Sequence, residues 1–351
     1  MKIDAMNDLD EQCAILLPPQ LRAYPWRMHP LDGKLLLFER NSGLNVLLEG
    51  EETAHLRRRA PRTLMIAVTN YCNLACSFCY RDKQTSSLWH YETLLEFCRQ
   101  ADQWGVLEVA FGGGEPLVFP RWQDFVCEIY ETTRLGINFT TNGTLLTESF
   151  LQAIAGHYGQ IRLSIYEDNN WAEKISLLTQ CQARFGINWL ITPRELLTLE
   201  AKFEQLFELG VRDFMLLSYK GCEPDLHLSE RDRQRLELFI LQAYEKLKSH
   251  ITLKLDVCWG DTLAAVPRLF SASDCGAGDD FISLTSDKRI KPCSFQPWAI
   301  PFESCSDVRA HWESQRSARE AALIAGCARL PNRGLNVEKE ADHAYIHLAR
   351  I

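Results

Sequence analysis

The chain has 351 residues, of which 46% are hydrophobic and 24% are charged, and its formal net charge is −8. This composition is typical of a protein that buries a large core in about two domains, and it excludes a mainly disordered chain. The acidic balance argues against broad binding to a nucleic-acid backbone, which needs a basic surface. The chain starts with MKIDAMNDLDEQ, which lacks the basic and apolar regions of a signal peptide, and no run of about 18 apolar residues follows. We therefore expect a cytoplasmic protein that neither enters a membrane nor binds nucleic acid.

The first 61 residues contain one clear structural signal. Residues 33–52 read GKLLLFERNSGLNVLLEGEE, with two apolar runs around the turn residues NSG. This pattern predicts a β-hairpin. The basic run HLRRRAPR follows at 55–62 and is either a solvated linker or a contact for an acidic peptide.

Beyond residue 62 the chain alternates short apolar runs with longer amphipathic ones. The amphipathic segments, such as YETLLEFCRQADQW at 91–104, predict helices. The apolar runs predict six buried strands, at residues 64–68, 106–113, 136–143, 160–166, 186–192 and 213–219. Six strand–helix units in a row imply an α/β fold with a parallel sheet, either barrel-like or open and doubly wound. In both architectures the chemistry lies at the carboxyl ends of the strands.

Three cysteines lie on the loop after the first of these strands: Cys72, Cys76 and Cys79, in the pattern C-x3-C-x2-C. In a reducing compartment such a group is better suited to metal binding or chemistry than to disulfides. A [4Fe–4S] cluster takes four cysteine thiolates, so three thiolates leave one iron open to another molecule. A zinc site completed by a histidine such as His90 is the structural alternative, although zinc usually takes its cysteines in two pairs.

The pattern C-x3-C-x-aromatic-C, with Phe78 before the last cysteine, resembles the signature of the radical S-adenosylmethionine (SAM) superfamily. The resemblance implies a partial (β/α)6 barrel, similar to a TIM barrel, over residues 62–250. It also implies that the three cysteines hold a [4Fe–4S] cluster whose open iron binds SAM, with Phe78 beside the cofactor. In this family an electron from the cluster cleaves SAM, and the resulting 5′-deoxyadenosyl radical takes a hydrogen from the substrate.

Three further stretches at expected strand ends are similar to motifs of this family: GGGEP at 112–116, TTNG at 140–143 and LSIY at 163–166. The resemblance implies that residues of these stretches contact SAM, namely Gly113, Gly114, Glu115, Thr141, Asn142 and Ser164. The first three of them would line the site for the SAM amino group, and the serine would contact its ribose or carboxylate. Taken singly, the stretches are also compatible with a flexible turn, a tight turn and a locally satisfied serine. Many relatives carry Asp-Gly after the serine strand, where this chain has Tyr166 and Glu167.

The C-terminal hundred residues contain a second group of cysteines. Residues 275–295 read CGAGDDFISLTSDKRIKPCSF, a hairpin pattern with a cysteine near each end. This arrangement resembles the SPASM and twitch extensions of radical SAM enzymes, which carry auxiliary [4Fe–4S] clusters. Five cysteines from residue 258 onward suit one auxiliary cluster and not two. The implied ligands are Cys275, Cys293 and Cys327, with Cys258 preferred to Cys305 as the fourth because it follows a strand-like segment. Cys222, just after the sixth strand, is kept as a candidate for a redox or hydrogen-donor role.

The resemblance implies three segments: an N-terminal extension at 1–61, a radical SAM core at 62–250 and a SPASM/twitch-like domain at 251–351. It implies an enzyme that modifies a ribosomally made precursor peptide, either by splicease-type excision of a tyrosine-derived unit or by crosslink or thioether formation. The short N-terminal extension resembles a remnant of a peptide-recognition domain, so a separate small recognition protein of the RRE type is expected. The reductant is expected to be a flavodoxin or ferredoxin. A twitch-type dehydrogenase of a small molecule and a non-catalytic cluster-binding regulator are the alternatives.

Overall fold

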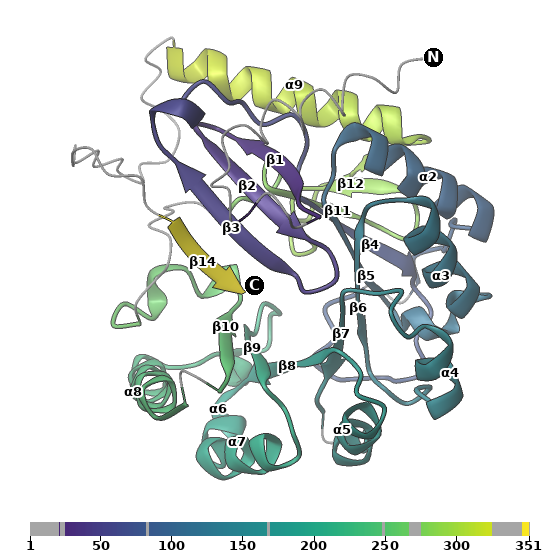
Figure 1. Cartoon of the computed structure of the whole chain (residues 1–351). Coiled ribbons are helices and arrows are strands. Elements are labelled where there is room, and N and C mark those ends of the chain that lie inside the picture. Colours follow the sequence, from purple (N-terminus) through teal and green to yellow (C-terminus); the bar gives the residue numbers. More distant parts are fainter. Residues whose placement is uncertain are drawn as a thin grey trace.

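The computed structural model describes residues 21, 25–81, 84–166, 169–247, 250–266, 275–324 and 346–350. Its main element is a ten-stranded sheet in the order β10-β9-β8-β7-β6-β5-β4-β11-β12-β13. From β4 to β10 the strands follow one another in chain order and are all parallel. Figure 1 shows the helices between them as an outer arc around the sheet. In a doubly wound sheet the strand order reverses at one point, whereas in a barrel each strand is added on the same side of the previous one. The unbroken order from β4 to β10 is therefore that of a partial barrel.

The six strands expected from the sequence correspond to β4–β9. The parallel strands are β4 (Thr63–Thr69), β5 (Glu108–Gly113), β6 (Gly136–Thr141), β7 (Gln160–Ser164), β8 (Phe185–Ile191), β9 (Asp213–Ser218) and β10 (Thr252–Leu255). The helices between them are α2 (Tyr91–Trp104), α3 (Trp122–Thr132), α4 (Glu148–Ala153), α5 (Trp171–Gln180), α6 (Pro193–Leu196), α7 (Leu199–Glu208) and α8 (Glu230–Leu247). Helix α2 has the bounds that the sequence pattern predicts, and it ends at Gly105, whose φ of 111° favours glycine.

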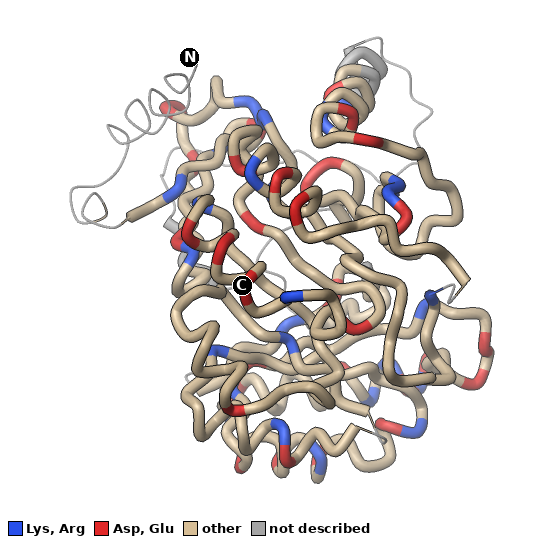
Figure 2. Tube along the Cα trace, turned by 90° about the vertical axis from the view of Figure 1, so that its right-hand side faces the viewer, with Lys and Arg blue, Asp and Glu red and all other residues tan. Residues whose placement is uncertain are grey.

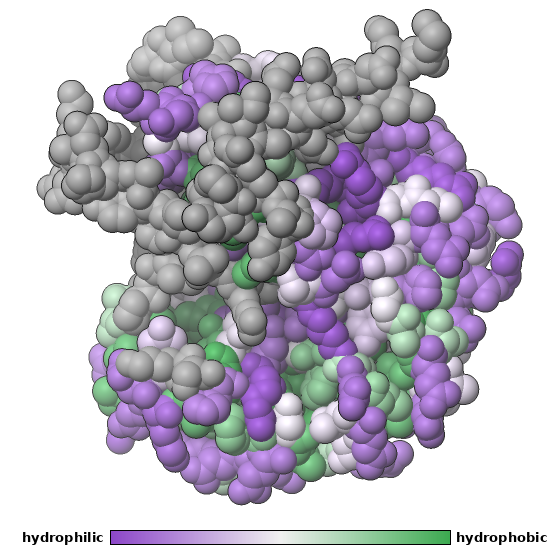
Figure 3. Space-filling view, viewed as in Figure 1, coloured by the Kyte–Doolittle hydropathy of each residue, from purple (hydrophilic) through white to green (hydrophobic). Residues whose placement is uncertain are grey.

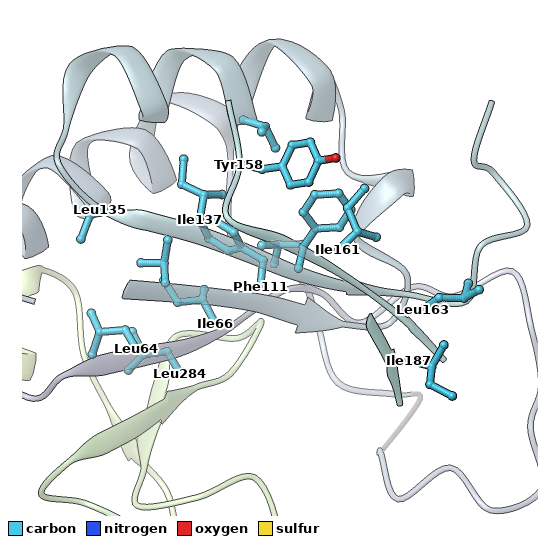
Figure 4. Packing of buried hydrophobic residues seen from close by; sticks show 14 of the residues in the cluster. Leu64, Ile66, Phe111, Leu135, Ile137, Tyr158, Ile161, Leu163, Ile187 and Leu284 are labelled. Atoms are coloured by element: carbon cyan, nitrogen blue, oxygen red, sulfur yellow. The ribbon is translucent and has the colours of Figure 1, made fainter. Parts of the chain in front are cut away.

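The main core lies between the barrel strands and the helices. In β4, Leu64 and Ile66 are buried, whereas Met65 between them is 37% exposed on the inner side of the sheet. Figure 4 shows side chains from neighbouring strands, among them Phe111 and Ile137, gathered on the helix side of the sheet. Alternation along each strand therefore leaves the other face to line the inside of the barrel.

The inside of the barrel carries charges near the amino ends of the strands. Arg162 on β7 pairs with Asp213 on β9 at 2.8 Å between Nη1 and Oδ1. Lys254 on β10 pairs with the other oxygen of the same carboxylate at 2.9 Å. These ion pairs join three strands across the floor of the barrel.

The predicted N-terminal hairpin is present and forms part of a larger antiparallel sheet. This sheet has the order β1 (Arg27–Leu31), β2 (Lys34–Glu39), β3 (Leu44–Glu49) and β14 (Ile346–Arg350). Strands β2 and β3 are the hairpin, β1 extends it on one side, and β14 from the other end of the chain extends it on the other. Figure 1 shows the sheet as purple strands with the gold strand β14 beside them.

The small sheet contacts the barrel at the amino ends of its strands. Phe38 packs in one cluster with Leu107, which directly precedes β5. Arg40, after β2, donates to the carbonyls of Tyr130 and Thr133 at 3.1 and 2.6 Å, just before β6. The small sheet therefore lies at the end of the barrel opposite to the loop that carries the cysteine motif.

Residues after 275 continue the large sheet. Strand β11 (Phe281–Leu284) pairs in parallel with β4, and β12 (Arg289–Lys291) returns antiparallel, so the predicted hairpin is present. Strand β13 (Ile300–Pro301) and helix α9 (Cys305–Ile324) follow, and Trp312 of α9 meets Trp104 of α2 with ring centroids 5.7 Å apart. The segment boundaries at 61/62 and 250/251 stay a prediction.

The basic run 55–62 is partly internal and partly exposed. Arg58 and Arg62 both pair with Asp280, which precedes β11, at 2.8 and 3.2 Å. Arg58 also lies 4.0 Å from Asp279. These two arginines are therefore used inside the protein, whereas His55, Arg57 and Arg59 are exposed, so for them a solvated linker or a contact for an acidic peptide stays a prediction.

In the described part of the chain, no helix combines the length and apolarity needed to cross a bilayer. Figure 2 shows basic and acidic residues interspersed along the described trace. On the face shown in Figure 3, hydrophobic residues lie among hydrophilic ones over the lower part of the molecule, where α5, α7 and α8 lie in Figure 1.

Candidate functional site

The cysteine motif lies on the loop that follows β4. Cys72 and Cys76 are half-buried, Cys79 is exposed, and none of the three is in a disulfide. The Cys79 amide donates to the Cys76 carbonyl at 3.3 Å, which closes a tight turn between the last two thiols. The Leu74 amide donates to the Cys72 sulfur at 3.5 Å. The motif is thus a short, bent loop at the carboxyl end of the first barrel strand.

Tyr166, just after β7, faces this loop. Its ring contacts that of Phe78, with centroids 5.0 Å apart and planes at 51°. Burial raises the pKa of Tyr166, and the three motif thiols raise it further. All three sulfurs therefore lie within electrostatic reach of one phenol.

The glycine stretch at the end of β5 lies against the start of the cysteine loop. A Cβ on Gly113, whose φ is 120°, would be 2.4 Å from the Thr69 carbonyl oxygen. A Cβ on Gly114 would be 1.8 Å from the Tyr71 carbonyl oxygen, whereas one on Gly112 would meet nothing within 4 Å. Two of the three glycines are therefore required by the backbone of this chain itself, independently of any cofactor.

Glu115 is buried beneath the same strand ends, with 1% of its surface exposed. Its carboxylate accepts from the Thr141 hydroxyl at 2.7 Å, the Asn142 amide at 2.7 Å and the Leu117 amide at 3.1 Å. Burial raises the pKa of Glu115, although these bonds act in the opposite direction. The carboxylate ties the end of β5 to the end of β6. The expected contact with the SAM amino group stays a proposal.

Two asparagines extend this network to the cysteine loop. The Asn142 side-chain amide donates to Asn73 at 2.9 Å and to the Cys72 sulfur at 3.8 Å. Asn169, only 2% exposed, donates to the carbonyls of Asn142 and Ser164 at 2.7 and 2.6 Å. Asn169 was missed from the sequence, although an asparagine in the run EDNN after a strand end is a signal for a structured turn.

The structure thus gathers the predicted cofactor residues at three neighbouring strand ends. Most of them are nearly inaccessible, since Thr141 is 1%, Ser164 5% and Asn142 6% exposed. Their hydrogen bonds hold the strand ends and the cysteine loop in place. Contacts between these residues and SAM stay a proposal.

The donor set of the cysteine loop fits an iron–sulfur cluster. Three thiols outside any disulfide lie on one loop, and Arg81 next to it lies in electrostatic contact with Cys72 and Cys79, which suits an anionic group. Across the described ranges, no three His, Cys, Asp or Glu side chains already stand close enough to hold a metal ion, so ligation has to draw the sulfurs together. His90 precedes α2 as its N-cap residue and belongs to no such group.

The second group of thiols lies beside the edge of the barrel near β10 and the C-terminal hairpin. Cys258 is in the 3-10 helix η5 (Val257–Thr262), which directly follows β10. Burial is the largest cause that raises the pKa of the Cys258 thiol to about 11, and Cys293 and Cys275 also contribute. Cys275 and Cys293 therefore lie within electrostatic reach of Cys258, although the three do not form a ready metal-binding group in the part of the chain that the structure describes. Cys327 lies outside the described residues.

Cys305 lies elsewhere. It begins helix α9, is 3% exposed, and burial raises the pKa of its thiol to about 12. Its neighbour is Cys98 of α2, whose pKa is raised by burial and by Cys305. The preference for Cys258 as the fourth auxiliary ligand agrees with this placement, and the ligand set stays a proposal. Cys222 is exposed just beyond β9, and its suggested role stays a prediction.

Two aromatic residues connect the two thiol groups. Tyr80 follows Cys79, Phe295 follows Cys293 by two positions, and their ring centroids are 4.6 Å apart. The Tyr80 hydroxyl also shares a hydrogen bond with the Ser294 side chain. The loop after β4 and the loop after β12 are therefore in direct contact.

The fold and the site define a parallel α/β partial barrel with a thiol-rich loop at the carboxyl end of its first strand. Residues 66–166 match the family model of the radical SAM superfamily. PqqA peptide cyclase of Gluconobacter oxydans is 33% identical over 259 residues, which cover 66% of this chain and 70% of that protein. The chain belongs to the radical SAM superfamily. This membership implies a [4Fe–4S] cluster and SAM as cofactors.

Other relatives match a shorter stretch of the chain. A probable GTP 3′,8-cyclase of Methanothermobacter marburgensis is 36% identical over 93 residues, which is 26% of this chain and 30% of that protein. The chain spans between 30% and 39% of the length of three such cyclases.

Two solved structures share the fold at low identity. Streptococcus suis SuiB has a TM-score of 0.60 at 18% identity, covering 73% of this chain and 66% of that chain. The structure of anSMEcpe with bound AdoMet has a TM-score of 0.58 at 18% identity, covering 74% of this chain and 79% of that chain. At these identities the likeness is one of fold alone.

Proposed function

We propose that this radical SAM enzyme modifies a ribosomally made precursor peptide. The observation that carries the proposal is the similarity over 259 residues to PqqA peptide cyclase, whose name states a peptide substrate. The fold relatives agree with this, because structures of SuiB with its precursor peptide SuiA and of anSMEcpe with a peptide are known.

In this proposal Cys72, Cys76 and Cys79 hold the first cluster. When bound, the cluster and SAM supply an organic radical that removes a hydrogen atom from the substrate. The chain's own residues prepare the loop for this task. The Asn142 amide donates toward the Cys72 sulfur, and the ring of Tyr166 packs beside the three thiols. Hydrogen bonding to ligand sulfur and restricted solvent access are the means by which a protein sets a cluster potential.

We further propose one auxiliary [4Fe–4S] cluster in the C-terminal region. Cys275 and Cys293 lie within electrostatic reach of Cys258, and Cys327 completes the proposed set of four ligands. The contact between Tyr80 and Phe295 supports a site beside the first cysteine loop. A substrate could then meet both metal sites at the carboxyl end of the barrel.

The finer proposal is a splicease-type maturase, with crosslink formation as the other peptide reaction. The small N-terminal sheet is poorly placed to deliver a peptide, since it contacts the barrel at the opposite end from the cysteine loop. Five- or six-residue strands separate the two ends by about 17–20 Å. We therefore propose a separate small recognition protein of the RRE type, together with a flavodoxin- or ferredoxin-type reductant.

The test is co-expression of the enzyme with each short peptide encoded beside its gene, followed by mass spectrometry of the peptide. A defined mass change that requires the three motif cysteines is expected. The matched control is the Cys72→Ala, Cys76→Ala, Cys79→Ala triple variant, which should bind less iron and make no 5′-deoxyadenosine. A triple variant with the wild-type iron content and 5′-deoxyadenosine formation would refute the cluster assignment.

A second candidate function is favoured by the identity to probable GTP 3′,8-cyclases, namely turnover of a small molecule. That identity is confined to about a third of this chain or less. In an assay of 5′-deoxyadenosine release, stimulation by a small molecule and by none of the peptides would favour this candidate. Absence of release under every condition would instead favour a non-catalytic regulator.

A further inference from the structure

Arg81 directly follows the cysteine motif and is anchored from two sides. Its Nε donates to the Asn70 side-chain oxygen at 3.0 Å, and its Nη2 donates to the Thr69 carbonyl at 3.2 Å. Both acceptors belong to the end of β4 and the residue after it. The guanidinium is therefore held in a fixed place behind the cysteine loop.

The remaining nitrogen of Arg81 points to the glycine stretch. A Cβ on Gly113 would be 2.8 Å from Arg81 Nη1, so only a glycine leaves the guanidinium room there. The charged or ionisable groups that act on it are Tyr80, Cys79 and Cys72. Arg81 thus lies between the glycine stretch and two thiols of the motif.

No carboxylate of the described residues forms an ion pair with Arg81, in contrast to Arg62 and Arg162. Arg62 pairs with Asp280 at 3.2 Å and Arg162 pairs with Asp213 at 2.8 Å. Arg81 has neutral oxygens as its hydrogen-bond acceptors, and its nearest ionisable groups are thiols. Shielding a cation from water without an anionic partner costs free energy. We therefore expect a negatively charged group to bind at the thiols beside Arg81.

We propose that Arg81 is a positioning residue that offsets the negative charge of the first cluster and thereby eases its one-electron reduction. A cluster ligated by thiolates is anionic, and reduction adds one more negative charge. A fixed cation beside it stabilises the reduced form more than the oxidised form. The inference rests on the assignment of Cys72, Cys76 and Cys79 as ligands, and it is independent of the substrate.

The test measures the midpoint potential of the first cluster, with dithionite as the reductant and electron paramagnetic resonance as the readout. The Cys275→Ala, Cys293→Ala background leaves one cluster to observe. In Arg81→Gln, one-electron reduction should become about tenfold less favourable, which is a potential lower by about 59 mV. Arg81→Lys should restore part of the shift, because it keeps the charge but loses the two-point anchor. The control is Arg121→Gln, which removes an exposed arginine at the start of α3.

The outcomes separate this inference from the proposed function. An unchanged potential in an Arg81→Gln protein with full iron content overturns it. Weaker SAM binding with an unchanged potential also overturns it, and assigns Arg81 to the SAM carboxylate instead. If Arg81→Gln fails to assemble a cluster, the midpoint potential is measured in Asn70→Ala instead. This variant removes one hydrogen-bond acceptor that anchors the Arg81 guanidinium, and it keeps the positive charge of Arg81. A lower potential in Asn70→Ala supports the inference, and an unchanged one overturns it. None of these measurements uses a peptide, so failure of the peptide proposal leaves the result intact.

Discussion

Two substitutions in the glycine stretch form a matched pair that tests how the site is built. Gly112→Ala and Gly114→Ala add the same methyl group two positions apart at the end of one strand. The Cβ on Gly112 meets nothing within 4 Å, whereas the Cβ on Gly114 falls 1.8 Å from the Tyr71 carbonyl oxygen and 2.4 Å from its carbon. We expect opposite effects on the free energy of unfolding.

The magnitude follows from the contacts that must be lost. An ordinary contact between carbon and oxygen is about 3.3 Å or longer, so the two backbones must separate by roughly 1.5 Å. The bonds from the Gly114 amide to Thr69 at 2.7 Å and from the Glu115 amide to Tyr71 at 2.9 Å do not survive that shift. Two such bonds at about 1 kcal/mol each, with about 1–3 kcal/mol of packing strain, give about 3–5 kcal/mol of destabilisation. Gly112→Ala should instead stabilise the chain by about 0.5 kcal/mol, because alanine loses less conformational entropy in a strand.

The assay is urea unfolding of the metal-free chain under reducing conditions, followed by the fluorescence of its 9 tryptophans. A lower midpoint at unchanged m-value for Gly114→Ala is the expected result. Anaerobic reconstitution should then show a weakened first cluster in that variant. Equal midpoints for the two variants would refute the contact between the glycine stretch and the cysteine loop.

Three further predictions concern an ion pair, the auxiliary thiols and the buried glutamate. Burial acts to raise the pKa of Asp280, but Arg62 and Arg58 hold this pKa below the usual range. The ion pairs of Asp280 therefore contribute to the free energy of unfolding above about pH 4, and this contribution is lost as the pH falls further. Asp280→Asn should therefore cost about 1–2 kcal/mol in urea unfolding at pH 7 and much less at pH 3, and an equal loss at both would contradict the pairing. Cys258→Ala should lower the stability of the auxiliary cluster or alter its electronic spectrum while the first cluster stays intact, whereas Cys305→Ala should do much less. The iron content should fall from about eight to about four per chain in the Cys275→Ala, Cys293→Ala double variant, and a wild-type value near four would argue against an auxiliary cluster. Glu115→Ala should weaken SAM binding by roughly 10- to 150-fold in calorimetry, and an unchanged affinity would show that this carboxylate has a structural role only.

Local patterns in the sequence were sufficient to predict the strands and helices of the barrel. The apolar runs that became β4–β9 are short, contain β-branched residues and are separated by amphipathic segments, so each could be recognised within its own stretch of chain. Helix α2 carries both a regular apolar face and a glycine directly after its last residue, and its predicted bounds of 91–104 are those of the structure. The cysteine motif was equally local, since its three thiols lie within eight positions.

Pairings between distant segments could not be predicted in this way. Strand β14 joins β3 across almost the whole length of the chain, and β11 joins β4 across more than two hundred residues. Nothing in the run 55–62 indicates that Arg58 and Arg62 meet Asp280, so two arginines of a run that resembles a surface segment form ion pairs within the protein. Strand partners and buried ion pairs depend on which surfaces the packed barrel brings together.

The same division applies to the site. The sequence by itself determined which residue types carry the chemistry: three thiols after the first strand, glycines and a carboxylate after the second, and cysteines around a C-terminal hairpin. Only the tertiary structure decided how they are used, because accessibility and neighbours are properties of the packed chain. In the folded chain Glu115 is buried and accepts three hydrogen bonds, and two of the glycines pack against the backbone of the cysteine loop. Arg81 lies beside that loop and has no carboxylate partner among the described residues. The tertiary structure also placed Cys258 with the hairpin thiols and Cys305 in the helical core, since packing around α2 and α9, and not spacing along the chain, determines which sulfurs are neighbours.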